Sequence, residues 1–245
     1  MTKRSFVFIL SVSFFSTSLV FAQNVDRFDF KSSYGAKVTY APNSSHILIG
    51  QAEGRSITTA GLEYTHRLWE KNRFKLDYTG EISPLYRQSD PTISGIEETY
   101  NGQTTKHMLA SPERIIQSPR GIVGEDCVTY APNCIPLYGI QGPNEITYGF
   151  ATAPLGVRAV FLPKNRIQPT FTVNAGFVVT QRPIPIDGAA FLNYQFSFGP
   201  GVNIFASDRS SFGVEYLYRH ISNGNADINP GIDQGIFCLT WRYYR

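Results

Sequence analysis

Three residues whose side chains could carry out acyl transfer lie close together near the end of the chain. His220 and Ser222 are two positions apart at the end of a strand-like run, and Asp233 follows after a short polar turn. Residues i and i+2 of an extended strand point to the same face. His220 and Ser222 therefore share a face if the strand continues through Ser222, and the return of the chain can bring Asp233 beside them. A nucleophile, a base and an orienting acid are the components of a hydrolytic site.

In such a site His220 would accept the hydroxyl proton of Ser222 as the serine oxygen attacks an ester carbonyl. Asp233 would hold the imidazole in the required tautomer and stabilise its charged form. The oxyanion that develops needs hydrogen-bond donors. The candidate donors within sequence reach are Asn223, Asn229 and the backbone N–H groups around Gly224.

Two alternatives stay open at this level. A His-x-Ser-Asn run at a strand end is also typical of a turn in which Ser222 and Asn223 cap the backbone. The acid is ambiguous as well, because Gln234 follows Asp233 directly and either side chain could contact the histidine.

Segments of alternating apolar and polar residues would have to position these side chains. Eight are predicted to be strands: 31–40, 57–69, 73–86, 145–162, 167–180, 189–205, 211–222 and 232–244. A soluble barrel turns its apolar face inward and a membrane barrel turns it outward, so alternation alone does not distinguish them. Long strands, a polar face of small and oppositely charged residues, and aromatic residues near the strand ends favour the membrane form. The sequence thus predicts an all-β fold, an eight-stranded antiparallel transmembrane β-barrel with a long inserted loop.

The parity of the candidate residues places them on the apolar face of this barrel. His220 and Ser222 have the same parity as Tyr216 and Tyr218, and Asp233 has the parity of Trp241. Polar groups facing lipid are costly and are usually functional. A site there would receive its substrate sideways from the membrane.

The N-terminus predicts export. A basic start, an apolar stretch and small residues up to Ala22 indicate a signal peptide over residues 1–22, which leaves residues 23–245 for the barrel. No later run is long and apolar enough for a membrane helix. The net charge of +3 gives no indication of nucleic-acid binding.

Residues 89–143 do not fit the strand pattern, because they show no sustained period and are rich in Pro, Gly, Ser, Thr and Asn. A long external loop is predicted here. Cys127 and Cys134 would form a local disulfide within it in an oxidising compartment. No metal site is expected, because His107 is the only nearby histidine and no ligand-spaced set surrounds it.

The site segment resembles a known family. The run His220-Ile-Ser-Asn223, with Asn229, Gly231, Ile232 and Asp233, is similar to the signature of the outer-membrane lipid A 3-O-deacylases (the PagL family). The similarity extends over Gln168–Gly176, Pro185 and Asn193–Val202, so it covers roughly the last third of the chain. The resemblance implies an eight-stranded barrel that removes the 3-position acyl chain of lipid A without metal or cofactor. It also implies His220 as base, Ser222 as nucleophile, Asp233 as acid and Asn229 as an oxyanion donor.

Three departures from the family pattern bear on this interpretation. The acid is typically Glu, whereas this chain has Asp233, and the turn before it is one residue shorter than usual. The segment 89–143 is an addition, and the chain ends in Arg245 and not in the Phe common to outer-membrane barrels. The first two affect the geometry of the triad, and the third affects substrate access and assembly.

The sequence therefore predicts an esterase of lipid A, or lipopolysaccharide, embedded in the outer membrane of a Gram-negative bacterium. One rival is a non-catalytic barrel with a structural, adhesive or binding role through residues 89–143. A second is a soluble periplasmic barrel that binds an apolar ligand inside. A homodimer, activity on phospholipids and the choice of ester stay open.

Overall fold

The structure is a computed structural model that describes residue 28 and residues 30–100, 103–116 and 137–245. The predicted signal peptide, residues 1–22, lies outside the described residues. The same is true of Cys127 and Cys134, so their pairing stays a prediction. Cys238 is described as a free thiol, buried on the inner face of the last strand.

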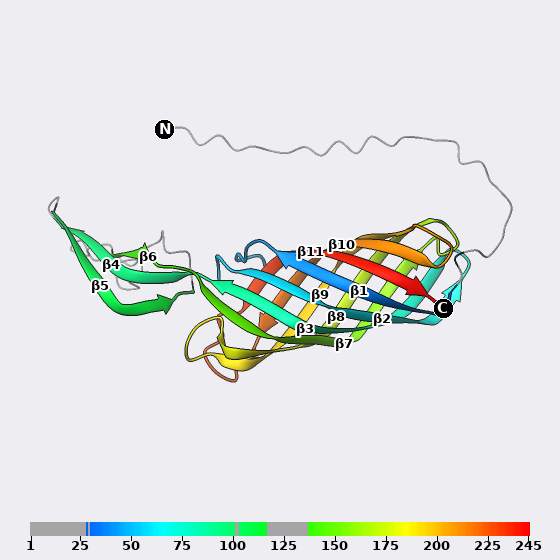
Figure 1. The fold of residues 1–245 in the computed structure, drawn as a ribbon. Coiled ribbons are helices and arrows are strands. Elements are labelled where there is room, and N and C mark those ends of the chain that lie inside the picture. Colours follow the sequence, from blue (N-terminus) through cyan, green and yellow to red (C-terminus); the bar gives the residue numbers. More distant parts are fainter. Residues whose placement is uncertain (1–27, 29, 101–102, 117–136) are drawn as a thin grey trace, which may run out of the picture.

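Eight of the strands in the described residues close into one antiparallel barrel, in the order β1-β11-β10-β9-β8-β7-β3-β2 (Figure 1). This confirms the predicted fold class, and each predicted strand overlaps an observed one. The barrel strands are β1 (Ser32–Ala41), β2 (Ser56–Lys71), β3 (Phe74–Asp90), β7 (Glu145–Phe161), β8 (Ile167–Ile184), β9 (Ala190–Phe205), β10 (Ser210–Ser222) and β11 (Ile232–Tyr244). The described residues contain no helix that is both long and apolar enough to cross a membrane.

The two faces of the barrel wall have the polarity of a membrane protein. Along β10, Glu215 is 2% exposed and Leu217 is 1% exposed, whereas Val214 and Tyr216 between and beside them are 48% and 53% exposed. The same alternation runs along β1 and β11, where the outward side chains include Tyr34, Val38, Leu239 and Trp241. Because apolar side chains cover the outside and charged ones are buried, the soluble barrel with an apolar interior is wrong.

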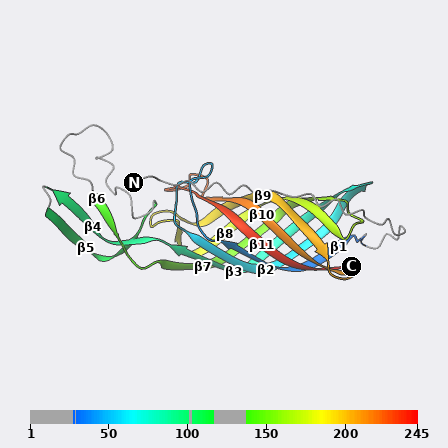
Figure 2. The same cartoon turned by 90° about the horizontal axis from the view of Figure 1, so that it is seen from above.

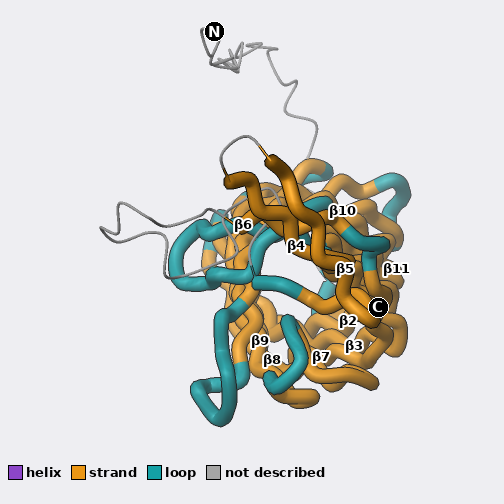
Figure 3. The backbone as a smooth tube through the Cα atoms, turned by 90° about the vertical axis from the view of Figure 1, so that its left-hand side faces the viewer, coloured by secondary structure: helices purple, strands orange, loops and turns teal. Residues whose placement is uncertain are grey.

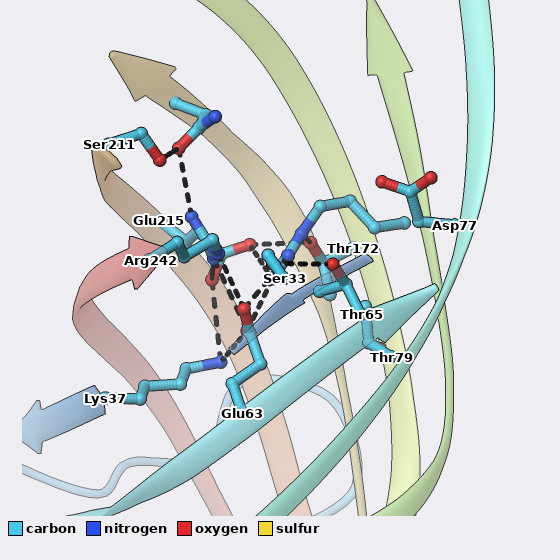
Figure 4. Close-up of polar contacts among 12 residues, drawn as sticks. Ser33, Lys37, Glu63, Thr65, Asp77, Thr79, Thr172, Ser211, Glu215 and Arg242 are labelled. Atoms are coloured by element: carbon cyan, nitrogen blue, oxygen red, sulfur yellow. Dashed lines mark hydrogen bonds and ion pairs between the residues drawn. The ribbon is translucent and has the colours of Figure 1, made fainter. Parts of the chain in front are cut away.

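Buried charges fill the interior of the barrel (Figure 4). Glu63 accepts from Arg158 at 2.6 and 3.1 Å and from Arg242 Nε at 2.6 Å. Lys37 Nζ lies 2.6 Å from Glu81 and 3.5 Å from Glu215. Two of the interior spaces have volumes of only about 30 and 10 Å³. A larger space of about 400 Å³ is lined by outward-facing side chains such as Tyr34 and Leu62 and reaches Glu63 and Glu81. Side chains that pair with one another therefore occupy the interior, as expected for eight strands.

The two ends of the barrel differ. At the end that carries the C-terminus, short turns join β2 to β3, β7 to β8 and β9 to β10. At the other end lie the longer connections, including the β1–β2 loop (residues 42–55) and the β10–β11 turn (residues 223–231). The candidate site residues all belong to this second end.

The inserted segment 89–143 is not the irregular loop that the sequence suggested. Its described residues form β4 (Thr92–Tyr100), β5 (Gln103–Arg114) and β6 (Leu137–Gln141), paired as a sheet in the order β5-β4-β6. This sheet projects beyond the barrel end (Figures 1 and 2), and Figure 3 shows it from that end. Nearly all residues of β5 are exposed. In β4, by contrast, Thr92 and Ile93 are both buried although they are adjacent. Neither strand has one buried and one exposed face, so neither shows the alternation of apolar and polar residues that predicts a strand.

Buried charges tie the inserted sheet to the barrel mouth. At the end of β5, Arg114 donates to Pro183 O at 2.7 Å and pairs with Asp187. Arg55, fully buried before β2, donates to Ile116 O at 3.0 Å and lies 3.0 Å from the carboxylate of Asp90. The base of the insertion is thereby held on the barrel.

Candidate active site

His220 and Asp233 form a hydrogen-bonded pair on the outer wall. They lie directly opposite each other in the register of β10 and β11, and their outward parity puts both side chains on the same side of the sheet. His220 Nδ1 lies 2.6 Å from Asp233 Oδ1. Cross-strand neighbours have Cβ atoms about 5 Å apart, which suits an imidazole joined to a short carboxylate. The acid–base part of the predicted site is therefore assembled by strand pairing alone.

Asp233 is fully buried and both of its carboxylate oxygens are hydrogen-bonded. The hydroxyl of Tyr218, two residues before His220, donates to Oδ1 at 2.8 Å. The backbone N–H groups of Leu48 and Ile49 donate to Oδ2 at 2.7 and 2.9 Å. Donors to a carboxylate stabilise its charged form and fix its orientation. The acid is thus held as an acceptor directed at the imidazole.

The β1–β2 loop reaches Asp233 by lying along the start of β11. Ser45 N donates to Asp233 O at 3.1 Å, and Ala52 N donates to Gly231 O at 2.9 Å. The approach is close enough that a Cβ on Gly50 would lie 2.5 Å from Asp233 N. Only glycine fits at that position, so the loop depends on Gly50 to come down onto the acid.

The imidazole of His220 is packed on two sides. The ring of Phe196, its partner on β9, lies at a centroid distance of 5.4 Å. On another side, a Cβ on Gly231 would lie 2.9 Å from His220 Cε1. Gly231 also has a φ of +62°, a conformation that favours glycine. The ring is therefore 7% exposed and fixed in place.

Ser222 shares the outward parity of His220 and lies opposite Tyr194 of β9. Within the described part of the chain, neither the hydroxyl of Ser222 nor His220 Nε2 has a hydrogen-bond partner. The structure therefore brings the base and the acid together, and it leaves serine and histidine on one face without a bond between them. Such contacts are often loose in the absence of substrate and tighten in the complex.

The predicted oxyanion donors lie in the β10–β11 turn, where their side chains hold the turn together. Asn229 Oδ1 accepts from Asn223 N at 3.2 Å, and Asn229 Nδ2 donates to Asn225 Oδ1 at 3.0 Å. Asn223 Nδ2 donates to Ile228 O at 3.2 Å. Gly224 has a φ of +68°, and its N–H has no partner among the described residues. In this structure both amides serve the turn, and the backbone at Gly224 is the donor left unengaged.

The choice between Asp233 and Gln234 has a structural answer. Gln234 points into the barrel, where it accepts from Arg219 Nη2 at 2.8 Å and donates to Arg55 O at 3.1 Å. Asp233 contacts the histidine. No group of three or more potential metal ligands lies among the described residues.

Sequence reasoning missed the role of four residues that support the acid: Tyr218, Leu48, Ile49 and Gly50. The parity of Tyr218 could have indicated its place, since it precedes His220 by two positions. The loop residues gave no local signal, because they lie about 185 positions from Asp233 along the chain.

The protein is an eight-stranded transmembrane β-barrel with a His–Asp pair on its lipid-facing wall. No protein-family model matches the chain, and no curated protein matches it.

The solved structures to which the chain is similar include three outer-membrane barrels. The outer membrane enzyme PagL matches at a TM-score of 0.46 and 14% identity, over 87% of this chain and 99% of that one. Neisserial surface protein A matches at 0.43 and 8% identity, over 87% and 97%. The outer membrane protein OprG from Pseudomonas aeruginosa matches at 0.42 and 8% identity, over 91% and 100%. At such TM-scores these likenesses say nothing about what this chain does.

Proposed function

We propose that the protein is an outer-membrane esterase that hydrolyses an acyl ester of lipid A, the 3-O-linked ester by its resemblance in sequence. Ser222 is the nucleophile, His220 the general base and Asp233 the orienting acid. The observation that carries the proposal is the 2.6 Å contact between His220 Nδ1 and Asp233 Oδ1 on the apolar outer wall.

The location of the pair supports a lipid substrate. His220, Ser222 and Asp233 interrupt a wall of exposed apolar side chains, and a buried carboxylate and imidazole are expensive to keep there without a use. A lipid held in the membrane would present its ester groups to this wall without leaving the bilayer. A water-soluble ester would have to enter the bilayer to reach this wall.

The reaction follows from the groups present. His220 Nε2 takes the proton of Ser222 as Oγ adds to the ester carbonyl, and Asp233 stabilises the imidazolium that forms. The backbone N–H of Gly224 is the candidate donor to the oxyanion. When the tetrahedral intermediate collapses, the bond to the sugar oxygen breaks and His220 gives its proton to that oxygen, which leaves as a hydroxyl. Water then attacks the acyl-serine with His220 again as base, which releases the fatty acid and restores Ser222.

Mass spectrometry of lipid A tests this proposal directly. Cells that make the wild-type protein should contain lipid A lighter by one hydroxyacyl group than cells without it. The Ser222→Ala variant should leave lipid A intact while it inserts normally, as judged by heat-modifiable migration on gels. Ser210→Ala at the opposite end of β10 is the matched control and should behave as wild type.

Two other outcomes would change the conclusion. Loss of the acyl group in both wild type and Ser222→Ala would keep an esterase and remove Ser222 from its role. Unchanged lipid A with a correctly inserted wild-type barrel would contradict the deacylase. A non-catalytic barrel that binds a partner through the projecting β4–β5–β6 sheet would then be favoured.

A further inference from the structure

Three consecutive apolar residues are exposed at the tip of the β1–β2 loop. Ile47, Leu48 and Ile49 are 46%, 59% and 58% exposed. The tip is closed by a 2.7 Å hydrogen bond between His46 Nδ1 and Gly50 O, so it is a compact turn. A run of exposed apolar residues in an ordered segment marks an interaction surface.

The tip lies outside the barrel wall. The side chain of Asp233 points outward, and the N–H groups that bond to its Oδ2 belong to Leu48 and Ile49 themselves. The loop therefore covers the outer face of β11. The exposed side chains of the tip point away from the barrel into its surroundings.

The apolar outer wall continues past the site toward the barrel mouth. Tyr194 lies opposite Ser222 on β9 and is 60% exposed. Leu192, two residues nearer the barrel mouth, is also apolar and exposed. The pair of His220 and Asp233 thus lies between exposed apolar side chains of β9, which belong to the lipid-facing belt, and those of the loop tip.

We propose that the tip of the β1–β2 loop, Ile47, Leu48 and Ile49, packs among acyl chains of the surrounding membrane and that this contact keeps its N–H groups on Asp233. The lipid contact is independent of the function proposed above, and its consequence for hydrolysis rests on that function. Leu48 and Ile49 are positioning residues, since their backbone acts through Asp233.

The two parts of the proposal are coupled through one short segment. The same residues place side chains in lipid and donate to the acid, so burial of the tip in hydrocarbon favours the conformation that holds Asp233. Coupling between two contacts is reciprocal. Removing the carboxylate should therefore loosen the tip from lipid, and removing the apolar side chains should loosen the acid.

Fluorescence quenching tests the lipid contact without reference to activity. The full chain carrying Leu48→Trp, with Trp69→Phe and Trp241→Phe to remove the native signal, is inserted into vesicles of phosphatidylcholine with brominated acyl chains. We expect the fluorescence to fall by half or more. Asp227→Trp, on an exposed turn at the same end, is the matched control and should be quenched by aqueous acrylamide instead.

The alternatives give different results. Quenching of Leu48→Trp by acrylamide alone would mean that the tip lies in water, and protection from both quenchers would mean that a second protein chain covers it. Either result overturns the proposal. The variant Leu48→Trp with Asp233→Ala tests the coupling, and equal quenching with and without the carboxylate would contradict it.

The effect on the reaction separates positioning from substrate binding. Replacing all three tip residues by Ser keeps every backbone N–H, and we expect kcat to fall about tenfold with a smaller change in KM. A change in KM alone would mean that the tip only binds substrate, which would overturn its positioning role. If the wild-type protein has no esterase activity, the proposed function fails, whereas the quenching results still decide the lipid contact and its coupling to Asp233.

Discussion

At the outer rim of the barrel, Asp233 receives hydrogen bonds from two parts of the chain: β10 through His220 and Tyr218, and the β1–β2 loop through Leu48 and Ile49. An aspartate is one methylene shorter than the glutamate typical of the resembled family. Here the loop comes down onto the short side chain, with only Gly50 allowing the approach. The carboxylate of Asp233 lies 2.6 Å from His220 Nδ1, so the shorter acid reaches the imidazole.

Tyr218→Phe should lower the hydrolysis rate without unfolding the barrel. The change removes one donor to Oδ1 of Asp233, while the two backbone donors at Oδ2 remain. We expect kcat to fall about tenfold, equivalent to about 1.4 kcal/mol, with KM nearly unchanged. Kinetics on purified protein in lipid would measure this.

Tyr216→Phe is the control for that experiment. Tyr216 is on the same strand and the same face, and its hydroxyl has no hydrogen-bond partner in the described part of the chain. It should keep wild-type kcat. Equal losses in the two variants would show that the phenol of Tyr218 acts through packing and not through Asp233.

At the scale of the elements, the barrel and the inserted sheet are joined through a narrow base. Asp90 at the end of β3 lies opposite Glu145 at the start of β7, so the two barrel strands are already paired where the insertion leaves. Gly142 N donates to Thr92 O at 2.8 Å, which brings the two ends of the insertion together. The barrel therefore has its complete wall without β4, β5 and β6.

Replacing residues 93–141 by an Asn-Gly turn should give a barrel that still folds and hydrolyses lipid A. Arg55 and Asp90 remain paired at the mouth after the deletion, although the contacts of Arg114 are lost. We expect the rate of deacylation to stay within about threefold of wild type, measured by mass spectrometry of lipid A. A folded deletion variant without activity would instead assign the inserted sheet a part in substrate access.

At the scale of the whole molecule, the interior is a neutral cluster of paired charges. Lys37, Arg158 and Arg242 contact the carboxylates of Glu63, Glu81 and Glu215, and all six belong to the strands of the closed barrel. These contacts join β1, β2, β3, β7, β10 and β11 across the interior. The charges hold opposite sides of the wall together.

Glu63→Gln should destabilise the barrel strongly. It leaves Arg158 and Arg242 buried without their main carboxylate partner, and removal of one member of a buried ion pair costs roughly 3–5 kcal/mol. Urea unfolding of the protein in lipid vesicles would measure the loss. The control is Glu113→Gln on the exposed strand β5, which should unfold at the wild-type urea concentration.

Local sequence determined the barrel and half of the candidate site. Period-2 alternation over long strands indicates which side chains face lipid. The parity of His220, Ser222 and Asp233 therefore predicts that all three lie on the outer wall. Short connections then bring β10 and β11 together, so the pairing of His220 with an acid also follows from neighbouring segments. The choice of Asp233 over Gln234 follows from the same parity, although only the structure assigned each side chain its partners.

The tertiary structure decided what local pattern does not encode. The support of Asp233 by Leu48 and Ile49 depends on barrel closure between β1 and β11, a contact between the two ends of the chain. In the inserted sheet, Thr92 and Ile93 of β4 are both buried and β5 is almost wholly exposed, so neither strand shows an alternation that would have predicted it. The turn that was expected to offer the amides of Asn223 and Asn229 uses them to hold itself together, because hydrogen bonds between side chains depend on the folded geometry of the turn and not on residue type.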